Sequence, residues 1–272
     1  MNKKITPLMI IGSGKCGTTT LYNHLIQHPE ICGGIIKEPE YFTLKRGNNN
    51  YKDASYYDLF DINLDIHKFI IDASTGYSMC HVEKDVPKRI KEYGLNPYII
   101  YLVRNPFERI ESHYNFNAKN IEWKEKINSS HLVETSMYYK QIEEYIKVFG
   151  KERVLLLDFD DLKNNPEDLS AKIFNFIGAR EFQVEIKIKI HNKTKPINRK
   201  KIKITHKLKS LKIRKIIPSF IKIWTIGVLN QTLRDKQKNL TEIQKKKIKK
   251  DLIDDMHNLN THYNIDVSKW GF

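Results

Sequence analysis

A loop that combines glycines, a lysine and three threonines carries the clearest chemistry in this sequence. An apolar run at residues 8–11 predicts a buried strand, and the apolar spacing within residues 21–26 predicts a helix. Three glycines lie between them, within residues 12–17. A strand, a glycine turn and a helix together present backbone N–H groups and a positive helix end to a phosphate. Lys15 adds a positive charge and residues 18–20 add hydroxyl donors. We therefore predict an anionic, phosphate-bearing ligand.

The spacing within this loop departs from the common nucleotide-binding motifs. A nucleoside-triphosphate P-loop has its lysine directly after the second glycine, whereas here Thr18 follows Gly17 and Lys15 precedes it. The loop also matches Gly-x-Gly-x-x-Gly, a dinucleotide pattern that requires an acidic residue about 20 residues later. Only Glu38 could fill that role, and it does not end a clear strand. A tight turn that binds no ligand is the remaining alternative.

A second motif predicts another phosphate contact. The apolar residues 98–103 predict a strand, which is followed by Arg104 and then by Pro106, a residue that suits the first turn of a helix. An arginine at the end of a strand can hold a phosphate with two hydrogen bonds, and Ser112 on the helix can donate a third. An ordinary strand–helix junction with surface charges is the alternative for this segment alone.

With both motifs in view, the chain resembles the carbohydrate sulfotransferases that use 3′-phosphoadenylyl sulfate (PAPS). The resemblance is greatest to the heparan-sulfate-type branch and its bacterial relatives. It covers about residues 7–196 and includes Lys37-Glu38-Pro39-Glu40-Tyr41-Phe42. It implies that the cofactor is bound by the glycine loop, by the Arg104 motif and by a late loop: Gly14, Lys15, Cys16, Gly17, Thr18, Thr19, Thr20, Arg104, Ser112, Lys193, Thr194 and Lys195.

The resemblance also implies the catalytic residues. Lys15 is placed to stabilise charge on the bridging oxygen that leaves, and Glu38 is placed to accept the proton of the attacking hydroxyl. From composition alone, Glu38 reads as a surface carboxylate paired with Lys37. One position departs from the family, because Ala73 stands where the heparan branch has a lysine. Either Lys37 compensates or Lys15 acts alone, and the neighbouring Asp72 either supports the site or caps a turn.

Alternating strand and helix patterns predict a single α/β domain over residues 1–272, and the resemblance implies that it is a sulfotransferase domain. We expect an α/β, P-loop-like three-layer fold, with a central mostly parallel sheet flanked by helices on both faces. The ligand should bind at the carboxyl ends of the strands. The predicted strands are residues 8–11, 68–71, 98–103 and 153–158, and the predicted helices are residues 18–27, 84–93, 106–117, 136–148 and 167–177.

The cysteines and histidines give no sign of a metal site or a disulfide framework. Cys16, Cys32 and Cys80 are odd in number and lack Cys-x-x-Cys spacing. The ten histidines also lack metal-ligand spacing. Sulfuryl transfer requires no metal, so we predict PAPS as the co-substrate and no metal ion.

Basic residues dominate the later part of the chain. The formal net charge is +15, and residues 186–222 contain 14 Lys or Arg and no Asp or Glu. Apolar residues alternate with lysines over residues 208–224, which predicts a basic, partly amphipathic helical region at about residues 196–262. A solvated basic face is the simpler interpretation. We expect a glycan or lipid-linked glycan acceptor, possible contact with an anionic membrane surface, and no nucleic acid.

The sequence opens without the pattern of a signal peptide or membrane span and is rich in Lys, Asn and Ile, so we expect a bacterial cytoplasmic enzyme of polysaccharide biosynthesis, peripheral at most at the inner face of the membrane. It is expected to transfer the sulfuryl group of PAPS to a hydroxyl or amino group of a glycan or glycolipid. A nucleotide kinase or NTPase is a weaker alternative, because Cys16 stands where such a loop needs a magnesium-binding Ser or Thr. A basic nucleic-acid-binding protein would leave both phosphate motifs unexplained.

Overall fold

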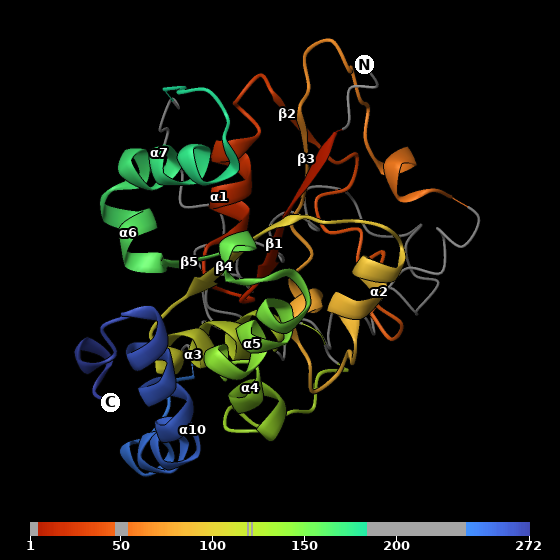
Figure 1. The fold of residues 1–272 in the computed structure, drawn as a ribbon. Helices are drawn as coiled ribbons and strands as arrows, with labels where there is room; N and C mark the ends of the chain where they lie inside the picture. The colour runs from red at the N-terminus through yellow and green to blue at the C-terminus, as the bar shows by residue number, and fades with distance from the viewer. Residues whose placement is uncertain (1–4, 47–53, 119, 121, 184–237) are drawn as a thin grey trace, which may run out of the picture.

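A five-stranded parallel sheet forms the centre of the molecule (Figure 1). The computed structural model describes residues 5–46, 54–118, 120, 122–183 and 238–272. The strand order is β2-β3-β1-β4-β5, so the first strand along the chain lies in the middle. The strands are β1 (Thr6–Gly12), β2 (Ile31–Gly33), β3 (Phe69–Asp72), β4 (Tyr98–Val103) and β5 (Val154–Asp158).

The pairing register brings the carboxyl ends of the strands to one edge of the sheet. Met9 of β1 pairs with Asp72 at the end of β3, and Val103 at the end of β4 pairs with Asp158 at the end of β5. Parallel strands that are covered on both faces read as continuous apolar runs, which is why β1 and β4 stood out in the sequence. The segments that follow β1 and β4 therefore emerge side by side.

Helices of the described chain cover both faces of this sheet. They are α1 (Thr18–Leu25), α2 (Val86–Glu92), α3 (Pro106–Asn117), α4 (Ser130–Glu134), α5 (Tyr138–Phe149), α6 (Phe159–Asn164), α7 (Pro166–Ile177) and α10 (Glu242–Tyr263). Short 3₁₀ turns join some of them, including η2 (Tyr56–Leu59), η3 (Thr75–Ser78), η4 (Lys151–Arg153) and η6 (Ser268–Trp270).

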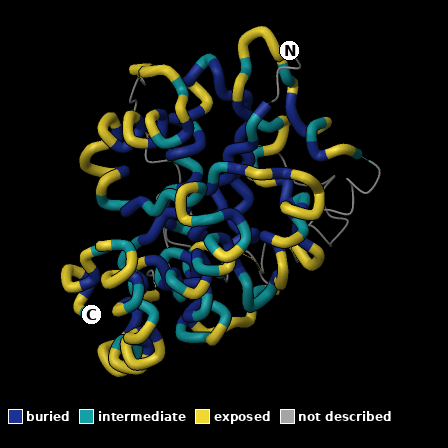
Figure 2. The backbone as a smooth tube through the Cα atoms, in the orientation of Figure 1, coloured by how far each residue is buried: buried dark blue, intermediate teal, exposed yellow. Residues whose placement is uncertain are grey.

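Alternate residues of β1 belong to two separate hydrophobic cores. Leu8 and Ile10 pack with side chains of α1, α6 and α7. Met9 and Ile11 pack with side chains of α2, α3, α5 and α10. Figure 2 shows these buried segments along the middle of the molecule, with exposed helix surfaces outside them. Sequence reasoning is therefore confirmed on the P-loop-like α/β fold with three layers and a parallel sheet.

Within the described residues, the predicted strands and helices match the structure, but three short elements were not predicted. β1, β3, β4 and β5 lie where strands were predicted, and α1, α2, α3, α5 and α7 lie where helices were predicted. Sequence reasoning did not predict β2, which has only three residues. It also missed α6, which follows β5 without an intervening loop, and the short α4.

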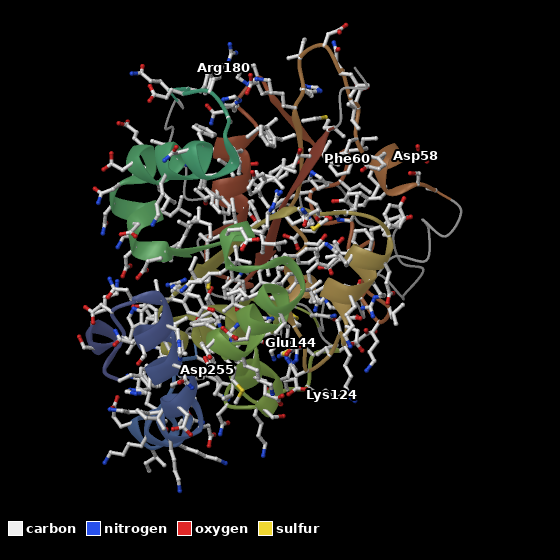
Figure 3. The ribbon with its side chains drawn as sticks, viewed as in Figure 1. Asp58, Phe60, Lys124, Glu144, Arg180 and Asp255 are labelled. Atoms are coloured by element: carbon white, nitrogen blue, oxygen red, sulfur yellow. The ribbon has the colours of Figure 1, made fainter. Side chains whose placement is uncertain are left out.

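The end of the chain packs onto the α3–α5 layer through α10. The carboxylate of Asp255 accepts backbone hydrogen bonds from Tyr139 and Lys140, at 3.0 and 2.9 Å. These donors lie in the first turn of α5, where N–H groups lack helical partners. Figure 3 labels Asp255 at this junction between α10 and α5. No helix in the described residues combines the length and apolar character needed to cross a membrane.

Candidate active site

A cavity of about 350 Å³ opens at the carboxyl ends of β1 and β4, and the predicted phosphate loop and Arg104 motif both line it. Its walls also include residues from the segments that follow β2 and β3. The lining residues are Gly14, Lys15, Gly17, Thr18, Thr19, Thr20, Glu38, Arg46, Thr75, Met79, Arg104, Ser112, His113, Phe116, Asn117, Trp123, His131 and Phe159.

The backbone of the loop after β1 requires a glycine at position 17. Gly17 has a φ of 86°, and a Cβ there would lie 2.9 Å from Leu162 and Phe159. Glycine is therefore required at this position both for conformation and for space. Gly17 is the N-cap of α1, so the first N–H groups of that helix, at residues 18–20, are free of helical partners and lie at the cavity. This end of α1 is suited to a phosphate.

Cys16 is the loop residue among 14–20 that does not line the cavity. Its side chain is fully buried in the core shared with α1 and α6. Its backbone N–H donates to the carbonyl of Ser13 at 3.1 Å. Burial raises the pKa of the Cys16 thiol to about 11, so the thiol is neutral and unreactive at physiological pH.

Lys15 and Arg104 meet where the two motifs come together. The Lys15 ammonium lies 3.8 Å from the centroid of the Phe116 ring. Arg104 donates to the Lys15 carbonyl at 3.3 Å and to Glu108 at 2.8 Å, and its guanidinium lies 4.6 Å from the Phe159 centroid. These contacts hold two positive charges at the cavity wall.

One face of α3 supplies the neighbouring wall. The helix begins at Pro106, and the Asn105 side chain caps it by accepting from two backbone N–H groups of the first turn. The helical repeat then places Ser112, His113 and Phe116 on the same side, and all three line the cavity. The structure thus brings the Ser112 hydroxyl to the cavity that Arg104 also lines.

Glu38 lies in the segment after β2 and lines the same cavity. Its Oε1 forms an ion pair with Lys37, and its Oε2 accepts a hydrogen bond of 3.4 Å from the Thr75 hydroxyl. Both Glu38 and Thr75 line the cavity, whereas Lys37 does not. The ion pair expected of a surface carboxylate is therefore present, yet the carboxylate also reaches the site.

Ala73 and the neighbouring Asp72 are buried in the protein interior. The Ala73 side chain is fully buried in the core on the α1 side of the sheet. Asp72 is also fully buried, and its carboxylate accepts from Tyr56 and Tyr77 and from both the backbone and the hydroxyl of Ser74. Burial raises the pKa of Asp72 to about 6, although these hydrogen bonds oppose the shift. Asp72 thus shapes the turn after β3 and does not line the cavity.

Sequence reasoning missed Arg46, which lines the cavity beside a buried carboxylate. The backbone N–H groups of Leu44, Lys45 and Arg46 all donate to Glu83, at 2.7 to 2.8 Å. The Arg46 Nε lies 3.9 Å from Oε1 of Glu40. No motif marks this arginine, because its role depends on contacts across nearly forty residues of chain.

Glu40 should make stability depend on pH. Its Oε1 accepts from the backbone N–H of Gly76, while its buried Oε2 has no hydrogen-bond partner among the described residues. Burial raises the pKa of Glu40 from 4.5 to about 7. The folded state therefore binds this proton more tightly than the unfolded state, so stability falls as the pH rises from about 4.5 to about 7.

The variant Glu40→Gln should remove that part of the pH dependence, about 1–3 kcal/mol. Urea unfolding of both proteins at the two ends of this pH range measures the difference. Asp72 and Asp255, whose pKa values burial also raises to about 6, contribute the same sign in both proteins and cancel. Identical pH slopes for the wild type and the variant would show that Glu40 is not responsible.

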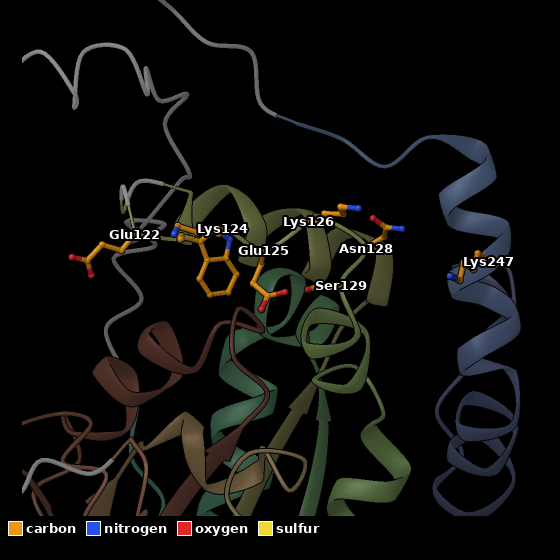
Figure 4. Close-up of a pocket in the computed structure, with 8 residues that line it drawn as sticks. Glu122, Lys124, Glu125, Lys126, Asn128, Ser129 and Lys247 are labelled. Carbon is orange, nitrogen blue, oxygen red and sulfur yellow. The ribbon is translucent and has the colours of Figure 1, made fainter.

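An aromatic and histidine-rich wall was also missed by sequence reasoning. His113 and Trp123 stack with their ring centroids 6.4 Å apart, and His131 lies 6.1 Å from Trp123. Trp123 also lines a second, open hollow of about 700 Å³ formed by residues 122–126, Asn128, Ser129 and Lys247. In Figure 4, Lys247 of α10 faces Lys126 and Asn128 across this hollow.

Three predicted cofactor residues, Lys193, Thr194 and Lys195, lie outside the described residues. The described residues contain no group of three or more His, Cys, Asp or Glu side chains arranged to hold a metal ion.

The chain belongs to the sulfotransferase family, because the family model described as "Sulfotransferase domain" matches residues 6–260. It is similar to mouse bifunctional heparan sulfate N-deacetylase/N-sulfotransferase 4, with 26% identity over 197 residues that cover 63% of this chain and 22% of the mouse protein. It is also similar to human carbohydrate sulfotransferase 15, with 25% identity over 242 residues that cover 62% of this chain and 43% of the human protein. The family predicted from the sequence is therefore confirmed. The chain spans less than half the length of these two relatives.

The fold is shared with a solved sulfotransferase from Alicyclobacillus acidocaldarius. The two structures superpose with a TM-score of 0.67 at 18% identity, over 99% of each chain. Neither a nucleotide kinase nor a nucleic-acid-binding protein is favoured by the family match. The departure of this loop from the P-loop spacing is consistent with that result.

Proposed function

We propose that this protein transfers the sulfuryl group of PAPS to a glycan acceptor, within a single domain. One observation carries the proposal above all others. The loop after β1, Arg104 and Ser112 after β4, and Glu38 after β2 line the same cavity. These residues are far apart in the sequence, and the parallel sheet brings the ends of their strands to one edge, where they line one cavity.

Each part of the cavity suits one part of the cofactor. The N–H groups and hydroxyls of residues 18–20 suit the 5′-phosphosulfate, because they combine donors with the positive end of α1. Arg104 and Ser112 suit the 3′-phosphate, since a guanidinium and a hydroxyl can bind its oxygens together. No step of this chemistry uses a metal ion.

The reaction needs one base and one cation at the reacting atoms. An acceptor oxygen or nitrogen attacks the sulfur in line, the bond from sulfur to the bridging oxygen breaks, and the bisphosphate leaves with that electron pair. We assign to Lys15, which lines the cavity, the stabilisation of the charge that develops on the bridging oxygen. Glu38 accepts the proton that the acceptor loses.

A glycan acceptor is supported by the names of the relatives and by the character of the cavity wall. The two relatives described above are a heparan sulfate N-sulfotransferase and a carbohydrate sulfotransferase. Trp123 offers an aromatic surface between the cavity and the second hollow, and Arg46 offers a positive charge. An extended acceptor could therefore reach from one to the other. A lipid-linked glycan and contact with an anionic membrane remain predictions, because the basic residues 186–222 lie outside the described residues. A bacterial, cytoplasmic setting in polysaccharide biosynthesis is likewise a prediction.

Thermal unfolding with different nucleotides tests the proposal. We expect adenosine 3′,5′-bisphosphate at a hundredfold excess over its Kd to stabilise the fold by about 2.7 kcal/mol. ATP with Mg²⁺ should stabilise it much less, because it lacks the 3′-phosphate that Arg104 and Ser112 would bind. A larger response to ATP with Mg²⁺ than to the bisphosphate would point to a kinase or NTPase instead.

A further inference from the structure

Arg109 of α3 is a fully buried arginine that has no carboxylate partner among the described residues. Its Nε donates to the Ser136 hydroxyl at 2.6 Å, and its Nη2 donates to the Leu132 carbonyl. Its Nη1 lies 3.0 Å from Nδ1 of His113, one helical turn further along α3. All three partners are neutral acceptors. A buried cation of this kind is costly, which suggests that it serves a purpose beyond packing.

The contact with Arg109 determines where His113 carries its proton. A guanidinium has only donors, so the nitrogen that faces it must offer a lone pair. Nδ1 of His113 is therefore unprotonated, and the neutral ring must carry its hydrogen on Nε2. The imidazolium form is excluded as well, because it would place an N–H against another N–H.

Burial and the charged groups near His113 oppose a second charge there. Arg109 on its own helix, His131 of α4, Lys15 of the phosphate loop and Arg46 all disfavour the imidazolium form. Burial acts in the same direction and is the largest cause, so the pKa of His113 lies well below 6.5. His113 thus stays a neutral donor across the physiological pH range.

His113 also lines the site cavity, which Lys15 and Glu38 line as well. Its Nδ1 edge faces Arg109, so the Nε2 edge lies on the far side of the ring. Phe116, one turn further along the same face of α3, has the Lys15 ammonium 3.8 Å from its ring centroid. A substrate oxygen beside Lys15 therefore lies on the same side of α3 as His113.

We propose that Arg109 is a positioning residue that fixes His113 as an Nε2–H donor, and that this N–H donates to a substrate oxygen beside Lys15. The second half of this inference rests on the proposed function. The oxygen belongs either to the transferring sulfuryl group or to the acceptor. In neither case is His113 the base, because Nδ1 is occupied by Arg109 and Nε2 already carries a hydrogen. Proton removal is thereby left to Glu38.

Nitrogen NMR of the whole protein tests the tautomer without any substrate. Long-range proton–nitrogen spectra, assigned by the loss of signals in His113→Asn, should show a bare Nδ1 and a protonated Nε2. This pattern should persist between about pH 5 and 8, where an ordinary histidine titrates. A protonated Nδ1, or an imidazolium near pH 6.5, would overturn the proposal. Because this readout needs no ligand, it is independent of whether the bisphosphate binds, which tests the proposed function.

Two substitutions of His113 then separate donation from packing. His113→Asn keeps an oxygen near the Nδ1 position for Arg109 but removes the donor to the cavity. His113→Gln keeps an N–H near the Nε2 position. We expect kcat/KM to fall about tenfold in His113→Asn, as expected for one lost hydrogen bond, and to be largely retained in His113→Gln. Bisphosphate affinity should be unchanged in both.

The constant that changes in His113→Asn identifies the substrate oxygen that accepts the hydrogen bond. Weaker binding of PAPS with unchanged binding of the bisphosphate assigns it to the sulfuryl group, since only PAPS carries that group. A raised KM for the acceptor assigns it to the acceptor. Equal losses in both variants, or wild-type kinetics in His113→Asn, would contradict the proposal.

Discussion

Glu38→Gln should lower kcat by about 10²–10⁴ and leave the affinity for the bisphosphate unchanged. The amide keeps the size of the side chain and can still accept the hydrogen bond from Thr75, which measures 3.4 Å in the wild type. It cannot take the proton that the acceptor loses on attack. The loss should therefore appear in turnover, because a general base acts in the transition state and contributes little to binding of the cofactor.

The chain offers a matched control for this substitution. Glu144 also forms an ion pair with a nearby lysine, Lys147 at 3.2 Å, and it lies on α5 (Figure 3) and does not line the cavity. Glu144→Gln should leave kcat unchanged. Initial rates of sulfuryl transfer and calorimetry with the bisphosphate measure both variants. Near-normal turnover in Glu38→Gln would assign the base to another group.

The parts of the fold that could be predicted are those that depend on local pattern. β1 and β4 are continuous apolar runs because both faces of a parallel sheet are covered, and such runs are visible in one dimension. β2 is different. Its three residues become a strand through pairing with β3, and a segment of that length has no period to detect.

The residues of the candidate site divide in the same way, into those that a local motif marks and those that only tertiary packing positions. The glycine loop and the Arg104 motif carry their chemistry in consecutive residues, so their arrival at one cavity could be anticipated from strand ends alone. Arg46 reaches the cavity through its anchor on Glu83. Arg109 becomes a buried cation only through contacts with Leu132 and Ser136. Such roles arise from tertiary packing and leave no mark in the local sequence.

The Ala73 position shows the limit of reasoning from a motif. The resemblance placed a family lysine there, and the two alternatives were help from Lys37 or Lys15 acting alone. The Ala73 side chain is fully buried in the core, and Lys37 pairs with Glu38 without lining the cavity. Among the described basic residues that precede β3, only Lys15 and Arg46 line the cavity. We therefore propose that Lys15 stabilises the negative charge that develops on the leaving oxygen.

Arg104→Ala should have the largest effect on cofactor binding. The guanidinium is held at the cavity by the Lys15 carbonyl, by Glu108 and by the Phe159 ring, so little freedom is lost when a ligand binds. The two-pronged contact that we propose between Arg104 and the 3′-phosphate would be charge-assisted, and truncating such a partner costs about 2–4 kcal/mol. The Kd for the bisphosphate should therefore rise by about 30- to 1000-fold.

Arg153 provides the control for this substitution, because it repeats the arginine–aromatic contact at the other end of the same strand. Its guanidinium lies 4.5 Å from the centroid of Tyr98, where β4 begins, whereas Arg104 follows the residue where β4 ends. Arg153→Ala should leave bisphosphate affinity unchanged, and Arg104→Lys should give an intermediate loss, since it keeps the charge but not the fork. Calorimetry on the three variants measures these affinities. Equal bisphosphate affinity in Arg104→Ala and the wild type would show that the 3′-phosphate does not bind at this end of β4. The main electrostatic reason to place PAPS in the cavity would then be lost.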